Sequence, residues 1–148
     1  MPFLPKPEIL ARSDWDCPAT NSVPQYTTVT HLIIHHTAIS RDDADWPKFM
    51  RDIWDLHVST RGWDDIGYNY VIDPNGLIYE GRGGGDDVRG AHFICANENT
   101  LGVALMGDFD EASPTAESLS SLVALLGWKC DQREIDPLGS TFHEGTQL

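Results

Sequence analysis

The chain has few basic residues, and this shortage excludes several classes of partner. Ten lysines and arginines stand against 23 aspartates and glutamates, which gives a formal net charge of −13 at pH 7. Binding to a nucleic-acid backbone depends on clustered Lys and Arg, so no nucleic-acid partner is expected. An anionic membrane surface is disfavoured for the same reason. No apolar run approaches the roughly 20 residues that cross a bilayer, so we expect no membrane insertion.

Cysteine is scarce as well. Cys17, Cys95 and Cys130 allow at most one internal disulfide and form no CxxC pair for a metal. A bridge between Cys17 and Cys130 would join the two ends of the chain, and the sequence leaves that pairing open. The first seven residues lack the long apolar core of a signal peptide, so no export signal is visible.

The length of 148 residues is that of one domain with an ordinary packed core. Prolines are frequent in residues 1–27, which we expect to form an irregular segment packed on the core. Residues 28–148 would then be the folded domain. Residues 28–35 are β-branched or apolar on both faces, which indicates an interior strand. In residues 43–58, apolar positions recur at spacings of three and four, which predicts a helix with one buried face.

The second half of the chain completes the predicted fold. Residues 68–72 and 77–80 flank the turn sequence Asp-Pro-Asn-Gly, which predicts a β-hairpin. Residues 101–106 form another apolar strand. After it, Ser113 is expected to cap a helix with Pro114 at its first position. The buried stripe of that helix is predicted at Leu119, Leu122, Val123 and Leu126. The order of elements predicts an α/β fold in which a mixed central β-sheet is packed by helices.

Two adjacent histidines end the first predicted strand. The apolar run of residues 32–34 leads directly into His35 and His36. Because successive side chains on a strand alternate between faces, only one of the two can enter a shared site. His31 and His57 carry no motif of their own and are expected to be structural.

Two other chemistries are weak alternatives. The glycine-rich residues 81–87 could suggest a phosphate-binding loop, but no helix-forming apolar segment follows them and two aspartates would repel phosphate. Cys95 with His92 nearby leaves a cysteine hydrolase as a remote possibility, although no orienting acid stands in a matching motif.

An ordered series of short motifs runs from about Arg12 to about Cys130. In chain order these are Arg-x-x-Trp at 12–15, His-His-Thr at 35–37, Gly-Trp-Asp-Asp-Ile-Gly-Tyr-Asn at 62–69, Gly-Arg-Gly at 81–83, Gly-Ala-His at 90–92, Asn97, Leu-Gly-Val at 101–103 and Met-Gly-Asp at 106–108. The series resembles the zinc-dependent N-acetylmuramoyl-L-alanine amidases, a group that includes bacteriophage lysozyme-type amidases and the animal peptidoglycan recognition proteins. The fold of that family agrees with the predicted mixed sheet.

The resemblance implies a Zn²⁺ ion with His35 as its first ligand. A catalytic zinc needs about three protein ligands and an open position for water. The family's other two ligands, a His and a Cys, are expected beyond Leu148, so residues 28–148 are expected to lack this ligand segment. His143 is a weaker candidate, because its context Phe-His-Glu-Gly departs from the family's Gly-His-Arg-Asp and no Cys follows. It also lacks the second His of a His-Glu-x-x-His motif.

The resemblance also implies roles for residues around the metal. Tyr68 is expected to donate a hydrogen bond to the developing oxyanion of the substrate. His92 and Asn97 match positions that line the family's peptide-binding groove. Arg82 and Arg89, in and after the glycine-rich loop, are candidates to bind a carboxylate of the stem peptide, and the alternative is that both are solvated surface arginines.

The function expected from these motifs is hydrolysis of peptidoglycan. The bond would be the amide between the lactyl group of N-acetylmuramic acid and L-Ala of the stem peptide. The alternative is a non-catalytic module that binds peptidoglycan or a muropeptide on the same fold. Either role implies an extracellular, periplasmic or cell-wall location, and a phage-encoded origin is compatible with it.

Overall fold

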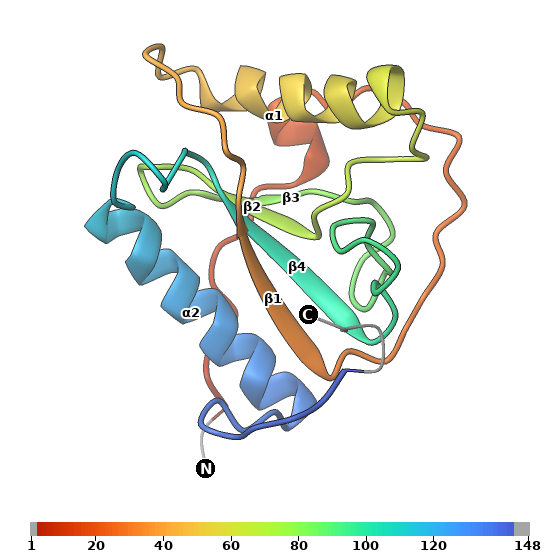
Figure 1. Ribbon diagram of the computed structural model, residues 1–148, viewed down its shortest axis with the longest axis vertical. Helices are drawn as coiled ribbons and strands as arrows, with labels where there is room; N and C mark the ends of the chain where they lie inside the picture. Colours follow the sequence, from red (N-terminus) through yellow and green to blue (C-terminus); the bar gives the residue numbers. More distant parts are fainter. Residues whose placement is uncertain (1–2, 144–148) are drawn as a thin grey trace.

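A four-stranded sheet forms the centre of the computed structural model, which describes residues 3–143 (Figure 1). Its strand order is β1 (His31–His36), β4 (Thr100–Leu105), β2 (Tyr70–Ile72) and β3 (Ile78–Glu80). β1 and β2 both run parallel to β4, whereas β2 and β3 are antiparallel. The predicted mixed sheet is therefore confirmed.

The turn between β2 and β3 has the predicted hairpin chemistry. The carboxylate of Asp73 accepts hydrogen bonds from the backbone N–H groups of Asn75 and Leu77 and from the hydroxyl of Tyr79. Gly76 has a φ of 85°, which a side chain would oppose. Local sequence thus defines this hairpin.

Two helices cover opposite faces of the sheet. α1 (Trp46–Asp55) is capped by Asp45, whose side chain accepts from the N–H of Lys48. It buries an apolar face against side chains from one side of the sheet. α2 (Ala116–Arg133) packs on the other side, among the alternate side chains of β2 and β4 (Figure 1). The site described below lies beside the C-terminal end of α1.

The second helix differs from its prediction. Its N-cap is Thr115 rather than Ser113. Leu119 is 43% exposed and Val123 is 71% exposed, so this part of the predicted buried stripe is wrong. The residues that the helix buries are Ser118, Leu125, Trp128 and Lys129. Several faces of this segment carry apolar residues, and contact with the sheet decides which of them is covered.

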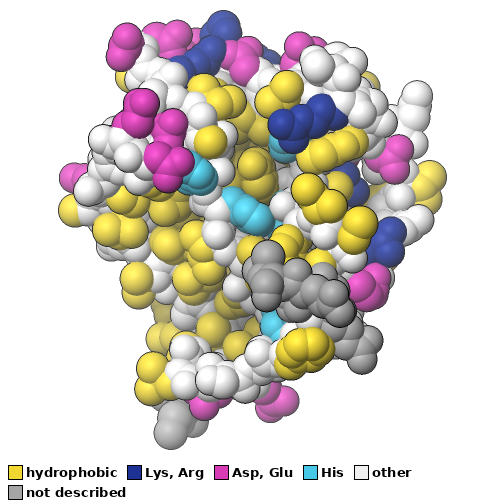
Figure 2. Space-filling model, viewed as in Figure 1, with side chains coloured by type: hydrophobic (Ala, Val, Ile, Leu, Met, Phe, Trp, Pro, Cys, Tyr) yellow, Lys and Arg dark blue, Asp and Glu magenta, His cyan; other side chains and the backbone are white. Residues whose placement is uncertain are grey.

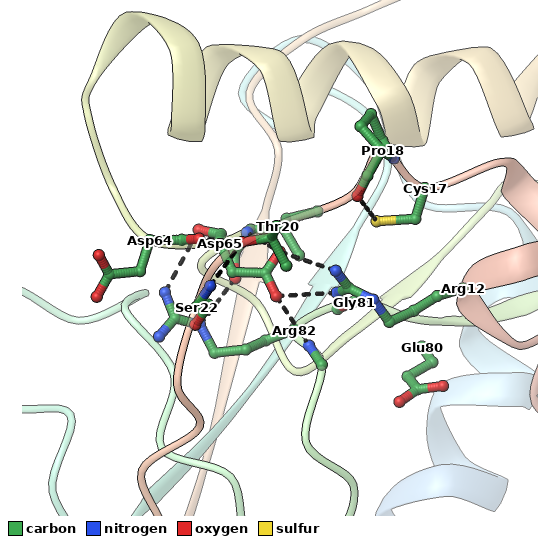
Figure 3. A network of polar contacts seen from close by, with 12 residues as sticks. Arg12, Cys17, Pro18, Thr20, Ser22, Asp64, Asp65, Glu80, Gly81 and Arg82 are labelled. Atoms are coloured by element: carbon green, nitrogen blue, oxygen red, sulfur yellow. Dashed lines mark hydrogen bonds and ion pairs between the residues drawn. The ribbon is translucent and has the colours of Figure 1, made fainter.

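Residues before β1 are held to the core by backbone and side-chain bonds. Leu10 forms backbone hydrogen bonds with both ends of β3, and Trp15 is fully buried. Arg12 of the short helix η1 (Arg12–Trp15) pairs with Asp65 at 3.1 Å, and Asp65 is 1% exposed. Figure 3 shows this carboxylate between Arg12 and the backbone after β3.

The cysteine and membrane expectations can also be compared with the structure. Cys17, Cys95 and Cys130 are all free thiols, so the open possibility of a Cys17–Cys130 bridge is not realised. Within residues 3–143, no helix combines the length and the hydropathy needed to cross a membrane.

Candidate functional site

The two histidines at the end of β1 face different surroundings. His35 Nε2 lies 2.9 Å from Nδ1 of His92, and the ring centroids of His35 and Tyr68 are 5.6 Å apart. His36 instead accepts a hydrogen bond from the backbone N–H of Phe109. Strand alternation therefore sends only His35 toward Tyr68 and His92.

The His92 ring is built into a cradle on β4. A β-carbon at Gly102 would lie 2.3 Å from its Cγ, and one at Gly90 would lie 2.7 Å from its Cδ2, so both glycines leave space for the ring. The side-chain oxygen of Asn97 accepts from the backbone N–H groups of His92 and Phe93. Burial, followed by the nearby charge of His35, lowers the pKa of His92 to about 3. The ring is therefore neutral at pH 7.

A groove of about 520 Å³ opens next to this pair, which is a common size for a ligand site. Within the described part of the chain, the Tyr68 hydroxyl and the side-chain N–H₂ of Asn97 have no hydrogen-bond partner. Burial raises the pKa of Tyr68, which keeps its hydroxyl protonated at neutral pH. We call this depression the Tyr68 groove; it is lined by His57, Arg61, Trp63, Tyr68, Ala91, His92, Phe93, Ile94 and Asn97.

Sequence reasoning missed three residues of this groove. His57 lies in η2 (Leu56–Thr60), a π-helical turn that continues α1, and its Nδ1 accepts from the N–H of Gly67. Its ring centroid lies 5.5 Å from that of Tyr68, and burial lowers its pKa to about 4. The Arg61 guanidinium lies 5.1 Å from the centroid of the Trp63 ring. The available signal was sequence position, because His57 and Arg61 lie just before the Gly-Trp-Asp-Asp motif and Trp63 lies within it.

A second depression of about 500 Å³ shares Trp63, Ala91 and Asn97 with the first. Arg89 lines it and binds Glu98 at 3.2 Å and the side chain of Gln25. The structure thus places Arg89 beside the Tyr68 groove rather than in it. A ligand carboxylate at Arg89 would compete with these internal partners.

The cysteine-hydrolase alternative finds no support in this arrangement. Cys95 is exposed. Both ring nitrogens of His92 are engaged, one with His35 and the other with the hydroxyl of Thr100. His92 therefore has no lone pair available to activate the Cys95 thiol.

The described residues do not by themselves fit a zinc ion. Within residues 3–143, no group of three or more His, Cys, Asp or Glu side chains is arranged to hold a metal. The nitrogens of His35 and His92 are hydrogen-bonded to each other, so they do not converge on an ion. His143 packs on His31 with ring centroids 4.9 Å apart. His31 lies at the other end of β1, about 13 Å from His35 at 3.3 Å per residue, so His143 is not brought to His35.

Comparison with known proteins shows the family to which the chain belongs. A family model described as N-acetylmuramoyl-L-alanine amidase, Amidase_2, matches residues 25–146. The chain belongs to this family, which confirms the resemblance carried by the motifs. The family contains both catalytic amidases and non-catalytic peptidoglycan-binding proteins.

One similar relative is a peptidoglycan recognition protein. Peptidoglycan-recognition protein LB of Drosophila melanogaster is 36% identical over 133 residues, which cover 87% of this chain and 56% of that protein. This chain therefore spans little more than half the length of that relative.

Solved structures show the same fold. The endolysin N-acetylmuramoyl-L-alanine amidase LysCS from Clostridium intestinale has a TM-score of 0.74 at 26% identity, over 89% of this chain and 79% of that one. Peptidoglycan recognition protein LE, in complex with tracheal cytotoxin, has a TM-score of 0.78 at 31% identity. That match covers 95% of this chain and 89% of the other.

Proposed function

We propose that the chain binds the stem peptide of a muropeptide in the Tyr68 groove. The observation that carries this proposal is that two hydrogen-bond donors, the Tyr68 hydroxyl and the Asn97 side-chain N–H₂, line one groove without partners in the described residues. A peptide offers backbone carbonyl oxygens as acceptors for such donors. The complex of recognition protein LE with monomeric diaminopimelic acid-type peptidoglycan supports this ligand class.

The charge and shape of the groove suit such a ligand. The chain is strongly acidic, yet the charged side chain that lines the Tyr68 groove is Arg61, while Arg82 and Arg89 line the adjoining depression together with Asp64 and Glu98. Figure 2 shows histidine side chains among hydrophobic ones on this face, one of them beside a Lys or Arg side chain and another beside Asp or Glu side chains. Arginines can bind peptide carboxylates, while Trp63 and Phe93 offer apolar walls. Peptidoglycan lies outside the cytoplasmic membrane, so we propose the same location for this protein.

Titration calorimetry with a soluble muropeptide tests the proposal. Tyr68→Phe removes the hydroxyl and keeps the ring, so the lost hydrogen bond should weaken binding by about 3- to 10-fold. Tyr70→Phe is the matched control, because Tyr70 lines a separate cavity with Lys6 and Glu80. Equal affinity of wild type and Tyr68→Phe, or no binding by the wild type, would contradict the proposal.

The second candidate is zinc-dependent hydrolysis of the amide between N-acetylmuramic acid and L-Ala. The observation that favours it is the approach of Tyr68 to His35, the residue that the family resemblance makes the first zinc ligand. The remaining ligands would have to come from outside residues 3–143, and no catalytic step through the metal is derived from the described residues.

Two measurements separate hydrolysis from binding alone. A chain that includes the expected second His and the Cys ligand is incubated with peptidoglycan and added zinc, and released stem peptides are quantified. Hydrolysis predicts release that falls about 10²- to 10³-fold in Tyr68→Phe, as for other oxyanion donors. It also predicts that His35→Ala abolishes stoichiometric zinc while His36→Ala retains it. Binding without any release would leave the recognition role alone.

A further inference from the structure

A small cavity lies where the three parallel strands end, and we call it the strand-end cavity. Its lining includes residues 39–41 after β1, Pro74 after β2, residues 106–109 after β4, and residues from the first turns of α1 and α2. Figure 1 shows both helices beginning at this end of the sheet. Ligands of open α/β sheets commonly bind outside the carboxyl ends of the strands. None of the lining residues belongs to the Tyr68 groove.

Three polar side chains that line this cavity carry an enclosed atom without a hydrogen-bond partner. These atoms are Nε1 of Trp46, Nη1 of Arg41 and the hydroxyl oxygen of Ser118, and the statement holds within residues 3–143. Ser118 as a whole is only 2% exposed. Native structures leave few buried polar groups unpaired, and each such group calls for an explanation. Three of them at one cavity point to a ligand that supplies the missing partners.

The hydrogen-bonding capacity of the lining defines the polar atoms of that ligand. Trp46 and Arg41 can only donate, so the ligand needs an acceptor oxygen. Asp108 also lines the cavity. Its Oδ1 accepts from the backbone N–H of Asp110, and within residues 3–143 its Oδ2 has no hydrogen-bond partner. An N–H on the ligand could therefore donate to Asp108.

The charges around the cavity favour a neutral ligand over an anion. Arg41 and Lys48 both pair with Asp52. Nη1 of Arg41 also lies 3.8 Å from Asp43, and Asp108 adds a negative charge at the cavity itself. Carboxylates thus offset the positive charge of the two basic side chains, and an anion at the cavity would be repelled by Asp108.

The size and the apolar part of the lining limit the ligand further. The cavity has a volume of about 160 Å³, close to the roughly 150 Å³ of an engineered cavity that binds benzene. Phe49, Met106 and Phe109 contribute apolar side chains to it. A methyl group placed against them is removed from water, which is favourable.

We propose that the strand-end cavity binds an acetamido group. Its carbonyl oxygen has two lone pairs to accept from the unpaired donors, its N–H donates to Asp108, and its methyl group packs on the apolar side chains. The cavity is separate from the Tyr68 groove, so this site does not rest on the proposed function.

Proton–nitrogen NMR of the full chain, titrated with N-methylacetamide, tests the proposal. A ligand with so few atoms binds weakly, so the titration extends to about 100 mM. The indole N–H signal of Trp46 should shift and approach saturation. The internal control is the indole N–H of Trp54, which is also in α1, enclosed and unpaired within residues 3–143 but outside the cavity, and it should not shift.

Two substitutions with matched controls test the contacts. Trp46→Phe removes the indole donor and should weaken binding by about 3- to 10-fold, whereas Trp54→Phe should not. Ser118→Ala should weaken binding to a similar extent, and Ser120→Ala, at an exposed position of α2, should leave it unchanged. For these variants, binding is followed by the backbone signals of residues 106–109.

The choice of small ligands tests the chemistry. Acetate has a similar size but carries a negative charge, and it should bind more weakly than N-methylacetamide. Methyl N-acetyl-β-glucosaminide and N-acetylalanine amide carry the acetamido group on a sugar and on an amino acid. The tighter binder of these two identifies the source of the group.

Three results would overturn the proposal. The first is the absence of a saturable shift at Trp46 in the wild type, which decides the question even if Trp46→Phe does not fold. The second is wild-type affinity in both Trp46→Phe and Ser118→Ala. The third is tighter binding of acetate than of N-methylacetamide, which would exclude a neutral amide as the preferred ligand.

Discussion

Gly102→Ala tests how closely β4 supports the candidate site. A β-carbon at this position would lie 2.3 Å from Cγ, 2.4 Å from Cδ2 and 2.6 Å from Nδ1 of His92. Carbon atoms in contact prefer separations of about 3.5–4.0 Å, so the ring must move by at least about 1 Å. Such a movement breaks the bonds from His92 to His35 and Thr100, which are 2.9 Å and 3.2 Å long.

The cost of this substitution can be estimated from its parts. Overpacking of a core costs about 1–3 kcal/mol. Each lost internal hydrogen bond adds about 0.5–1.5 kcal/mol. The lower entropy of alanine in the unfolded chain returns about 0.4–1 kcal/mol. With central values for each part, the free energy of unfolding should therefore fall by about 3 kcal/mol, within limits of about 1 and 6 kcal/mol, which is a large share of the roughly 5–15 kcal/mol typical of a domain.

Urea denaturation followed by fluorescence measures this loss. With a slope of about 1–3 kcal/mol per molar urea, the midpoint should fall by about 1–2 M. Gly127→Ala, within helix α2, is the control, because a β-carbon there would meet only the exposed side chain of Leu4. This substitution should be neutral or stabilising. If Gly102→Ala has the wild-type midpoint and an unchanged His92 spectrum, the ring does not lie against β4.

Two further predictions concern the frame around the groove. Arg12→Met leaves the buried carboxylate of Asp65 without its cation, so the free energy of unfolding measured in urea should fall by about 3–5 kcal/mol. The control is Lys48→Met, which removes an exposed ion pair and should change the free energy of unfolding by less than about 1 kcal/mol. A loss of less than about 1 kcal/mol in Arg12→Met would refute the structural role of the Arg12–Asp65 pair. The pKa of His57, about 4 in the fold, lies below its ordinary value of about 6.5, so between these pH values the unfolded chain binds a proton that the folded chain does not. Stability should therefore fall as pH decreases from about 7 to 4, by about 3 kcal/mol from this residue, and His57→Asn should lack that part of the decrease; an identical pH profile in the variant would contradict the assignment.

Local sequence patterns were sufficient for most of the fold. Alternation and turn chemistry predicted β1, β4 and the hairpin, because strand faces and Asp-Pro-Asn-Gly turns depend on neighbours along the chain. The buried face of α2 was predicted only in part. Leu119 and Val123 are as apolar as Leu125, and only contact with the sheet distinguishes them.

The sequence alone determined the family, the mixed sheet and the two-faced His35-His36 pair, since ordered motifs and strand alternation are properties of the chain itself. Only the tertiary structure brought His57 and Trp63 to Tyr68, because a π-helical turn after α1 sets the direction of these side chains. Only the tertiary structure revealed the connection from Thr100 through His92 to His35, since these bonds link segments as far as 57 residues apart. Hydrogen-bond direction depends on which atoms meet in space, and no local pattern in the chain records it.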